Sequence, residues 1–297
     1  MASFYPRMVA LLAVSMSTAA CIGAEIDEDS EEFVDVDASA TVAENGFIPN
    51  ALIPNALIPN ALIPNALIPN ALIPNALIPN ALSQKALGAI RDPGTSGSLS
   101  RELLRYIVGC ALRPDQSFAF SWMDSSGVVH PETYRGELGL AHWWALTSIA
   151  GDTYVQRLLT ACLASRANWY GVSVTISLRS NEAPSLASER TTYTVKEGAF
   201  WGNVFSTTPY LQACYSPSGI ARARQVQRDC AAGHLNVDPV TGATTNQPCG
   251  AIEIVGSCDA VCNSVDSVGG FYRGCLDRAA TSPSVRTDQV ITSFLPP

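Results

Sequence analysis

Residues 100–112 read SRELLRYIVGCAL, and this stretch predicts the first main helix of a folded domain. Ser100 stands where an N-cap belongs, and the apolar residues after it recur at the spacing of one helix face. That face consists of Leu103, Leu104, Ile107, Val108 and Ala111, with Cys110 beside them. A second long helix is predicted over Thr153–Trp169, because its apolar residues share a face and Gly171 follows it.

The residues after the first helix alternate in the way that half-buried strands do. Phe118–Met123 predicts a strand, Ser125-Ser126-Gly127 predicts a turn, and Val128 begins a return strand. Further strands are predicted at 172–178, 191–195, 251–255 and 290–294. Helices and strands in this order predict one α+β domain at 98–297. The stretch 83–97 is expected to be a linker, because 92–98 is rich in Pro, Gly, Ser and Thr.

Charge is unevenly distributed along the 297 residues. The formal net charge is −8, yet residues 21–99 hold ten acids and two bases, whereas 100–297 hold sixteen acids and fifteen bases. The acidity therefore belongs to the region before the domain. Because the domain has no basic stripe of the kind that contacts phosphates, no nucleic-acid partner is expected.

The first 21 residues, MASFYPRMVALLAVSMSTAAC, have the layout of an export signal. Arg7 precedes an apolar run over Met8–Met16, and small residues follow. Thr18-Ala19-Ala20-Cys21 resembles a bacterial lipobox, although that pattern prefers Leu where Thr18 stands. The resemblance implies a signal peptide at 1–20 and a membrane attachment through lipid on Cys21. The alternative is ordinary cleavage after Ala20, which would leave a secreted protein with a free thiol.

The cysteine count supports lipid on Cys21, because the other eight cysteines form an even set inside the domain. An exported chain oxidises such cysteines, so four disulfides are expected. We expect Cys110 and Cys162 to pair because they lie on the two predicted helices, and the pairing of the others stays open. The eight are Cys110, Cys162, Cys214, Cys230, Cys249, Cys258, Cys262 and Cys275.

Two low-complexity segments lie between Cys21 and the domain. Residues 21–46 are acidic, with nine acids in Ala24–Glu44, and are expected to form a disordered tether. Residues 47–82 carry the pentapeptide ALIPN, repeated six times over Ala51–Asn80. Its regular prolines exclude a helix, and Ile-Pro-Asn-Ala favours a β-turn. We interpret the repeat as a spacer; the alternatives are a pentapeptide β-helix and a segment that associates with itself, the membrane or the wall.

Three stretches resemble a family of uncharacterised bacterial envelope lipoproteins with a Cys-rich C-terminal domain. They are Arg101–Tyr106 leading to Cys110, Cys162–Arg179, and Glu197–Asn203. The resemblance implies export to the cell envelope, with the outer membrane as the expected place. It implies no activity.

Two pairs of residues have spacings that bear on metal binding. Cys258-x3-Cys262 and the pair Cys230 and His234 have spacings similar to zinc sites, but oxidised cysteines offer no thiolates, so neither a metal nor a cofactor is expected. The sequence has no Gly-x-Ser-x-Gly and no His-Glu-x-x-His motif. Paired carboxylates could instead serve a cell-wall hydrolase.

The candidate carboxylates are Glu137, Glu197 and Asp152, which lie near aromatic residues and glycines. The alternative is that they are surface residues or pair with Arg135 and Arg179. Trp143 and Trp144 are the candidate binding residues, because aromatic faces stack on sugars. The five tryptophans fall within 80 residues, and at least three are expected in the core.

The sequence therefore predicts a lipid-anchored envelope protein whose domain binds or scaffolds at the cell surface, with a cell-wall or surface glycan as the expected ligand. A hydrolase and a self-associating protein are the alternatives.

Overall fold

The computed structural model describes residues 42–45, 72–73, 76–77, 84–145, 152–206, 208–280 and 284–297. The expected signal peptide with Cys21, most of the acidic tether and most of the repeat lie outside this part, as does the side chain of Trp144. Within it, no helix combines the length and the apolar character that a membrane span requires.

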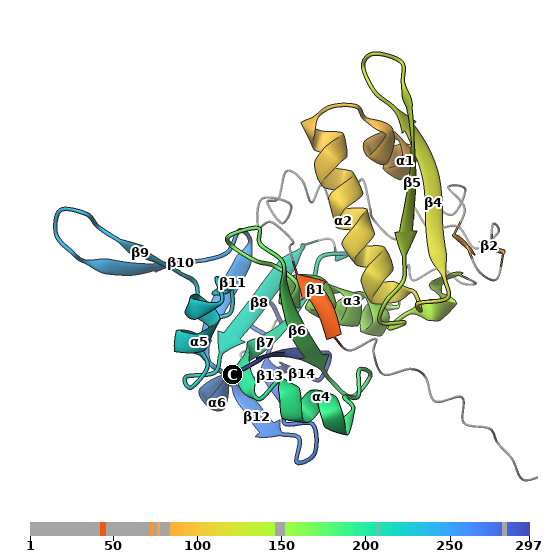
Figure 1. Cartoon of the computed structure of the whole chain (residues 1–297). Helices are drawn as coiled ribbons and strands as arrows, with labels where there is room; N and C mark the ends of the chain where they lie inside the picture. The colour runs from red at the N-terminus through yellow and green to blue at the C-terminus, as the bar shows by residue number, and fades with distance from the viewer. Residues whose placement is uncertain are drawn as a thin grey trace, which may run out of the picture. The chain divides into compact units, whose positions relative to one another are not determined.

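The fold mixes helices and sheets, as predicted (Figure 1). Its main sheet has the order β1-β6-β15-β7-β8-β11, and neighbouring strands are antiparallel except β8 and β11. The strands of this sheet are β1 (Val42–Asn45), β6 (Val174–Arg179), β7 (Val195–Asn203), β8 (Tyr210–Tyr215), β11 (Ile252–Ser257) and β15 (Ile291–Leu295).

Both faces of the central strand β7 are covered, which explains why Glu197–Asn203 is buried throughout. Phe200 belongs to the larger hydrophobic cluster, which includes the helices. Ala199 and Trp201 belong to a second cluster that contains Cys214 and Cys258. Successive residues of a strand point to opposite faces, so the two clusters lie on the two sides of this strand.

Most helical residues of the larger cluster come from α1 (Gln84–Arg91), α2 (Thr95–Ala111) and α3 (Thr153–Ser165). Helix α3 packs against β7, β8 and β15, and α2 packs against α3 and a hairpin. The hairpin consists of β4 (Ser117–Met123) and β5 (Val129–Arg135), paired over their full length. The predicted disulfide between Cys110 of α2 and Cys162 of α3 is confirmed.

The stretch expected to be a linker is part of the folded unit. Leu87 and Ile90 of α1 are buried, and α2 begins at Thr95 rather than at Ser100. Arg101 holds the two helices together, since its Nη1 donates to the carbonyl oxygens of Ile90 at 2.9 Å and Asp92 at 2.8 Å. A Cβ at Gly97 would lie 1.8 Å from the Asp92 carbonyl oxygen. The glycine therefore serves a close helix contact rather than flexibility.

Two further predictions of secondary structure are wrong in detail. Residues 187–192, which include the start of the strand predicted at 191–195, form helix α4 (Ala187–Thr192), and β7 starts at Val195. Buried Glu189 of α4 accepts a hydrogen bond from Ser177 of β6, which fixes this turn of helix against the sheet. Helix α3 ends at Ser165 rather than near Trp169.

Short segments of the tether and the repeat are ordered into strands. Val42–Asn45 pairs antiparallel with β6, whereas the sequence predicts a disordered tether as far as residue 46. In the repeat, β2 (Leu72–Ile73) and β3 (Ala76–Leu77) pair with Ile73 opposite Ala76. Pro74 and Asn75, the central residues of the β-turn predicted there, lie outside the described residues. Strand β3 also pairs parallel to β4.

The remaining elements are short and lie mostly after β8. They are α5 (Ile220–Gln225), β9 (His234–Val237), β10 (Thr244–Gln247), α6 (Cys258–Val261), β12 (Cys262–Val265), β13 (Tyr272–Leu276) and β14 (Arg286–Thr287). Three more disulfides close this region and complete the expected four. They join Cys214 to Cys258, Cys230 to Cys249, and Cys262 to Cys275.

Candidate functional site

The predicted catalytic carboxylates all have structural partners. Glu137 is half-exposed, and one of its oxygens lies 2.5 Å from Nη2 of Arg166 at the C-cap of α3. Glu197 is buried and accepts hydrogen bonds from Nε of Arg228 at 2.6 Å and from Ser293 at 2.7 Å. Both glutamates thus pair with arginines, although these are not Arg135 and Arg179, which the sequence offered as the alternative to a catalytic role.

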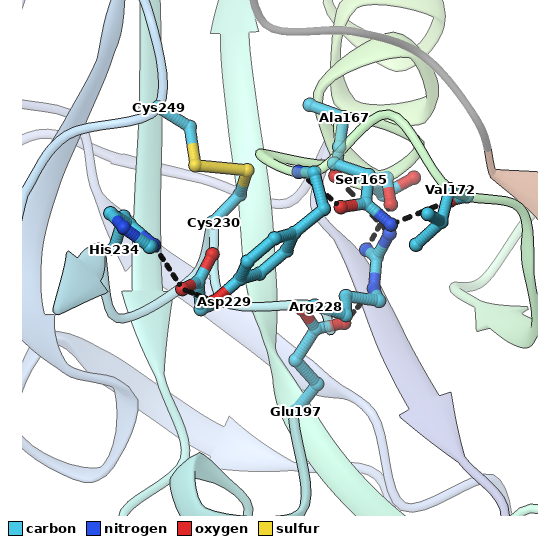
Figure 2. Close-up of a disulfide and its surroundings, with 11 residues drawn as sticks. Ser165, Ala167, Val172, Glu197, Arg228, Asp229, Cys230, His234 and Cys249 are labelled. Carbon is cyan, nitrogen blue, oxygen red and sulfur yellow. Dashed lines mark hydrogen bonds and ion pairs between the residues drawn. A yellow bond between two sulfur atoms is a disulfide. The ribbon is translucent and has the colours of Figure 1, made fainter. Parts of the chain in front are cut away.

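Arg228 explains why Glu197 is placed in the core. Besides the ion pair, its guanidinium donates to the backbone carbonyl oxygens of Ser165 and of Ala167, the latter at 3.2 Å (Figure 2). Carbonyls at a helix C-terminus lack partners within the helix, and Arg228 provides a donor for that of Ser165, the last residue of α3. The Glu197–Arg228 pair therefore locks the end of α3 to β7.

Asp152 is the N-cap of α3, and its Oδ1 accepts a hydrogen bond from the backbone N–H of Val155 at 3.1 Å. Such a cap satisfies one of the free N–H groups of the first helical turn. None of the three acids is left without a structural role.

The tryptophans divide between core and surface. Trp201 is fully buried, and its Nε1 donates to Gln212 at 2.8 Å. Trp122 and Trp169 are partly buried and pack against the larger cluster. Trp143, one of the two predicted binding residues, is 38% exposed and meets His142 edge-on.

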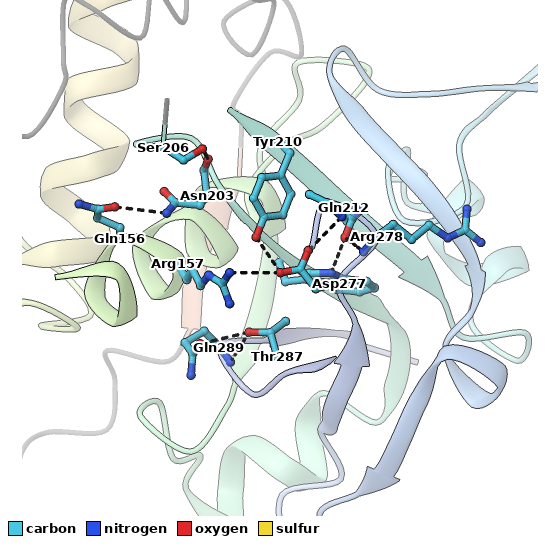
Figure 3. Close-up of polar contacts among 12 residues, drawn as sticks. Gln156, Arg157, Asn203, Ser206, Tyr210, Gln212, Asp277, Arg278, Thr287 and Gln289 are labelled. Carbon is cyan, nitrogen blue, oxygen red and sulfur yellow. Dashed lines mark hydrogen bonds and ion pairs between the residues drawn. The ribbon is translucent and has the colours of Figure 1, made fainter. Parts of the chain in front are cut away.

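One polar cluster connects α3, β8 and the segment after β13 (Figure 3). Buried Asp277 accepts a hydrogen bond from the Tyr210 hydroxyl at 2.8 Å and forms an ion pair with Arg157, whose Nη2 lies 3.3 Å from its Oδ2. Burial, followed by the bond to Asp277, raises the pKa of Tyr210 well above its ordinary value. The ion pair and the hydroxyl hydrogen bond engage these side chains with one another, which describes a structural network rather than a binding site.

A different site, which the sequence did not indicate, lies at the base of the β9–β10 ribbon. The ribbon extends away from α5 and β11 (Figure 1). The Cys230–Cys249 disulfide joins the residues just outside the two strands. His234 pairs with Gln247, and Leu235 pairs with Asn246. Because neighbouring residues alternate, His234 lies on one face of the ribbon and Leu235 with Asn246 on the other.

Gly233 allows the chain to enter the ribbon at this point. Its φ is +85°, and a Cβ there would lie 2.6 Å from Cδ1 of Ile254 and 3.1 Å from the carbonyl oxygen of Gln247. Only glycine combines that backbone angle with so close an approach. The backbone conformation of Gly233 therefore fixes where the next residue, His234, lies.

On the first face, His234 lies between aromatic rings and a buried acid. Its ring stacks on Trp169 with centroids 4.5 Å apart and an interplanar angle of 6°. Its Nδ1 lies 2.9 Å from Oδ2 of Asp229, which also accepts from the Tyr170 hydroxyl at 3.3 Å (Figure 2). Burial, and then Asp229, raises the pKa of Tyr170. The four side chains form a clamp that holds the ribbon against the segment after α3.

On the second face is a cavity of about 280 Å³, which we call the ribbon-base cavity. Apolar and aromatic groups form part of its wall, and an arginine, a hydroxyl and an amide provide polar atoms. The lining residues are Tyr215, Ile220, Arg224, Ala232, Leu235, Thr244 and Asn246.

Arg224 supplies the only charge among the residues that line the ribbon-base cavity. Its Nη2 lies 3.3 Å from Oδ1 of Asn246, whereas its Nε is buried and has no hydrogen-bond partner among the described atoms. No carboxylate of the described residues lies within ion-pair distance of it. A cation lining a concave, partly apolar wall is a typical ligand-binding arrangement.

Two groups of residues bring cysteine sulfurs close together: Cys214, Cys262 and Cys275, and Asp229 with Cys230 and Cys249. All of these cysteines are in disulfides, so they offer no thiolates of the kind that zinc binds. Cys230 and His234, whose spacing is similar to that of a zinc site, therefore have other partners: Cys230 is bonded to Cys249, and Nδ1 of His234 contacts Asp229.

In comparisons with known proteins, no family model, curated protein or solved structure matches this chain. The ribbon-base cavity therefore stands on its own geometry. The sequence held only a faint signal for it, namely Gly233-His234 between two cysteines. Arg224 carries no local signal, because IARARQ is a short helix with two equivalent-looking arginines.

Proposed function

We propose that this chain is an exported envelope protein, anchored through lipid on Cys21, whose domain binds a ligand at the cell surface. The observation that carries the binding role is the ribbon-base cavity, where Arg224 has a buried donor without an acceptor among the described atoms. Binding sites are commonly concave and apolar with a few well-placed polar groups. The cavity has this composition.

The anchoring role is supported by the cysteine pairing. The eight cysteines of the domain pair among themselves. Cys21, the ninth in the sequence, is therefore left over for another purpose. The lipobox-like sequence and the resemblance to envelope lipoproteins favour lipid, with the outer membrane as the proposed location. The acidic tether and the repeat would then act as a spacer between lipid and domain.

Anchoring is tested by expressing the full chain and Cys21→Ala in a bacterial host. Wild type should partition into detergent and carry the mass of a lipid, whereas the variant should be found in the aqueous phase. An aqueous wild type with unmodified Cys21 would favour the secreted alternative.

Binding is tested by blocking the ribbon-base cavity from its rim. Thr244→Phe places a ring in the cavity, and Thr245→Phe places the same ring on the opposite face of the same strand. Both positions are exposed, so neither change disturbs the core. Retention of the purified full-length protein on isolated cell envelopes should fall at least tenfold for Thr244→Phe only. Equal retention of both variants and wild type would remove this cavity from the proposal.

Trp143 supports a second contact with a surface glycan, because this aromatic residue is 38% exposed. Trp143→Ala should then weaken retention on glycan without lowering the melting temperature. The hydrolase alternative has less support, since the partners of Glu137, Glu197 and Asp152 give each acid a structural role.

A further inference from the structure

We infer that the ribbon-base cavity is a carboxylate-binding site, in which Arg224 takes the acid group of a small sugar acid or of a peptide C-terminus. This inference rests on the proposed binding function and names the chemistry of its ligand. The two sources share a carboxylate on a compact body.

The Arg224 guanidinium has few hydrogen-bond partners among the described residues. Nε is buried without a protein partner among the described residues, and Nη2 makes one long contact of 3.3 Å to Asn246. The N–H groups of Nε and Nη2 lie along one edge of the guanidinium, which matches the two oxygens of a carboxylate. The edge that suits an acid is thus the edge that the protein leaves largely unused.

Arg222 lies on the same helix, and its side chain makes different contacts. Nε of Arg222 donates to the carbonyl oxygen of Pro296 at 2.9 Å, and Nη1 lies 3.4 Å from Gln225. Arg222 is therefore used by the protein to hold the C-terminal segment. Arg224, two residues further on, lines the cavity instead.

Polar and apolar groups line the ribbon-base cavity around Arg224. The Oδ1 atom of Asn246 faces the guanidinium, so its amide N–H groups are directed elsewhere. Thr244, two residues earlier in β10, adds a hydroxyl on the same face of the ribbon. Ile220, Leu235 and the ring of Tyr215 provide an apolar wall. A ligand with one acid group, a few hydroxyls or amides and an apolar face satisfies all of these.

The volume of the ribbon-base cavity limits the size of its ligand. The volume of about 280 Å³ lies at the lower end of small-molecule sites. A single sugar ring or the last two residues of a peptide suits such a volume, whereas a longer glycan or peptide would have to extend beyond it.

The experiment uses matched ligands with the purified full-length protein. Methyl glucuronide is compared with methyl glucoside, and N-acetyl-alanyl-alanine with its C-terminal amide, by calorimetry and by NMR of the Arg224 Nε–H signal. At least one acid should bind at least tenfold more tightly than its neutral analogue and should shift that signal. Whichever acid binds identifies the source. An acid that binds no better than its neutral analogue would overturn the carboxylate assignment.

Arg224→Gln should weaken binding of the acid at least tenfold, Arg224→Lys should restore part of it, and Arg222→Gln should stay within twofold of wild type. Unchanged binding in Arg224→Gln would overturn the inference. The Nε–H signal of the wild type keeps the test valid if that variant fails to fold. If no acid binds but Thr244→Phe still loses envelope retention, the carboxylate is wrong and the binding function stands. If that retention is also unaffected, both fail.

Discussion

Two glycines of the β9–β10 ribbon have positive φ angles, and only one of them is also tightly packed. Gly233 has a φ of +85° and would place a Cβ 2.6 Å from Ile254, whereas Gly242 has a φ of +70° and open space around it. Gly233→Ala should therefore cost more stability than Gly242→Ala, which adds only the backbone strain of about 1 kcal/mol. Urea unfolding measures both variants. Equal losses would mean that the contact with Ile254 relaxes freely.

The buried pair of Glu197 and Arg228 predicts a large effect of a nearly isosteric change. Glu197→Gln leaves a fully buried guanidinium without its counter-charge, so we expect a loss of about 3–5 kcal/mol in the free energy of unfolding. Asp115→Asn, which removes an exposed pair with Arg113, should cost less than about 1 kcal/mol. A stable Glu197→Gln protein would contradict the structural role of this acid.

Asp152 permits a test that separates the hydrogen bond of a helix cap from the charge of its carboxylate. Asp152→Ala removes the bond to the Val155 N–H and should cost about 1 kcal/mol, whereas Asp152→Asn keeps an acceptor oxygen and should cost little. Thermal unfolding of both variants measures the difference. A loss of the same size in both would show that charge, rather than the cap, is what the helix needs.

At the scale of elements, the ribbon is held at its base by a disulfide and by the His234 clamp. Cys230→Ala with Cys249→Ala removes the disulfide, which closes a loop with a sequence separation of 19. The unfolded chain then regains conformational entropy, so the free energy of unfolding should decrease by about 3 kcal/mol. We expect faster hydrogen exchange in β9 and β10 and weaker ligand binding.

The control for that variant is the loss of the Cys262–Cys275 bridge, with a separation of 13. Its loss should lower the free energy of unfolding by a similar amount. After correction for that global loss of stability, hydrogen exchange in β9 and β10 should be the same as in wild type. If both variants affect the ribbon alike, the ribbon unfolds only with the whole domain.

Elements also show where local patterns are sufficient. Strands β4 and β5 follow from alternation and a turn sequence, and α2 and α3 follow from apolar spacing, because these signals act within one element. The residues of α4 instead are rich in Ser, Thr and charged side chains, and their helix depends on Glu189 reaching Ser177 of β6. Helix α1 likewise depends on Arg101, which lies eleven residues after Ile90.

At the scale of the whole molecule, three turns hold carboxylates whose pKa values are lowered. His130 and Ser126 lower the pKa of Asp124, and backbone N–H groups lower those of Asp238 and Asp266. A lowered folded pKa contributes stability above the unfolded pKa near 3.9, and that contribution is lost as pH falls further. We expect the melting temperature to decrease as the pH is lowered below about 4.

The triple variant Asp124→Asn, Asp238→Asn, Asp266→Asn measures how much of that fall belongs to the turns. Its melting temperature should be lower than wild type at pH 7 and should change less between pH 4 and pH 2.5. An equal change in both proteins would assign the acid sensitivity to other carboxylates.

The amino-acid sequence by itself determined the mixed helix and sheet character, the two main helices, the hairpin and the Cys110–Cys162 bridge. Each depends on the periodicity or turn chemistry of neighbouring residues, or on helices that such patterns predict. It also holds the arguments for export, which the described residues do not test.

Only the tertiary structure decided which partners the other six cysteines take and where a ligand can bind. The ribbon-base cavity combines Tyr215 of β8, Arg224 of α5, Leu235 of β9 and Asn246 of β10, which are brought together by the Cys230–Cys249 bridge and the ribbon register. No segment of sequence contains that arrangement, because its members meet only after long-range pairing is fixed. The arginine acquires its unused edge for the same reason.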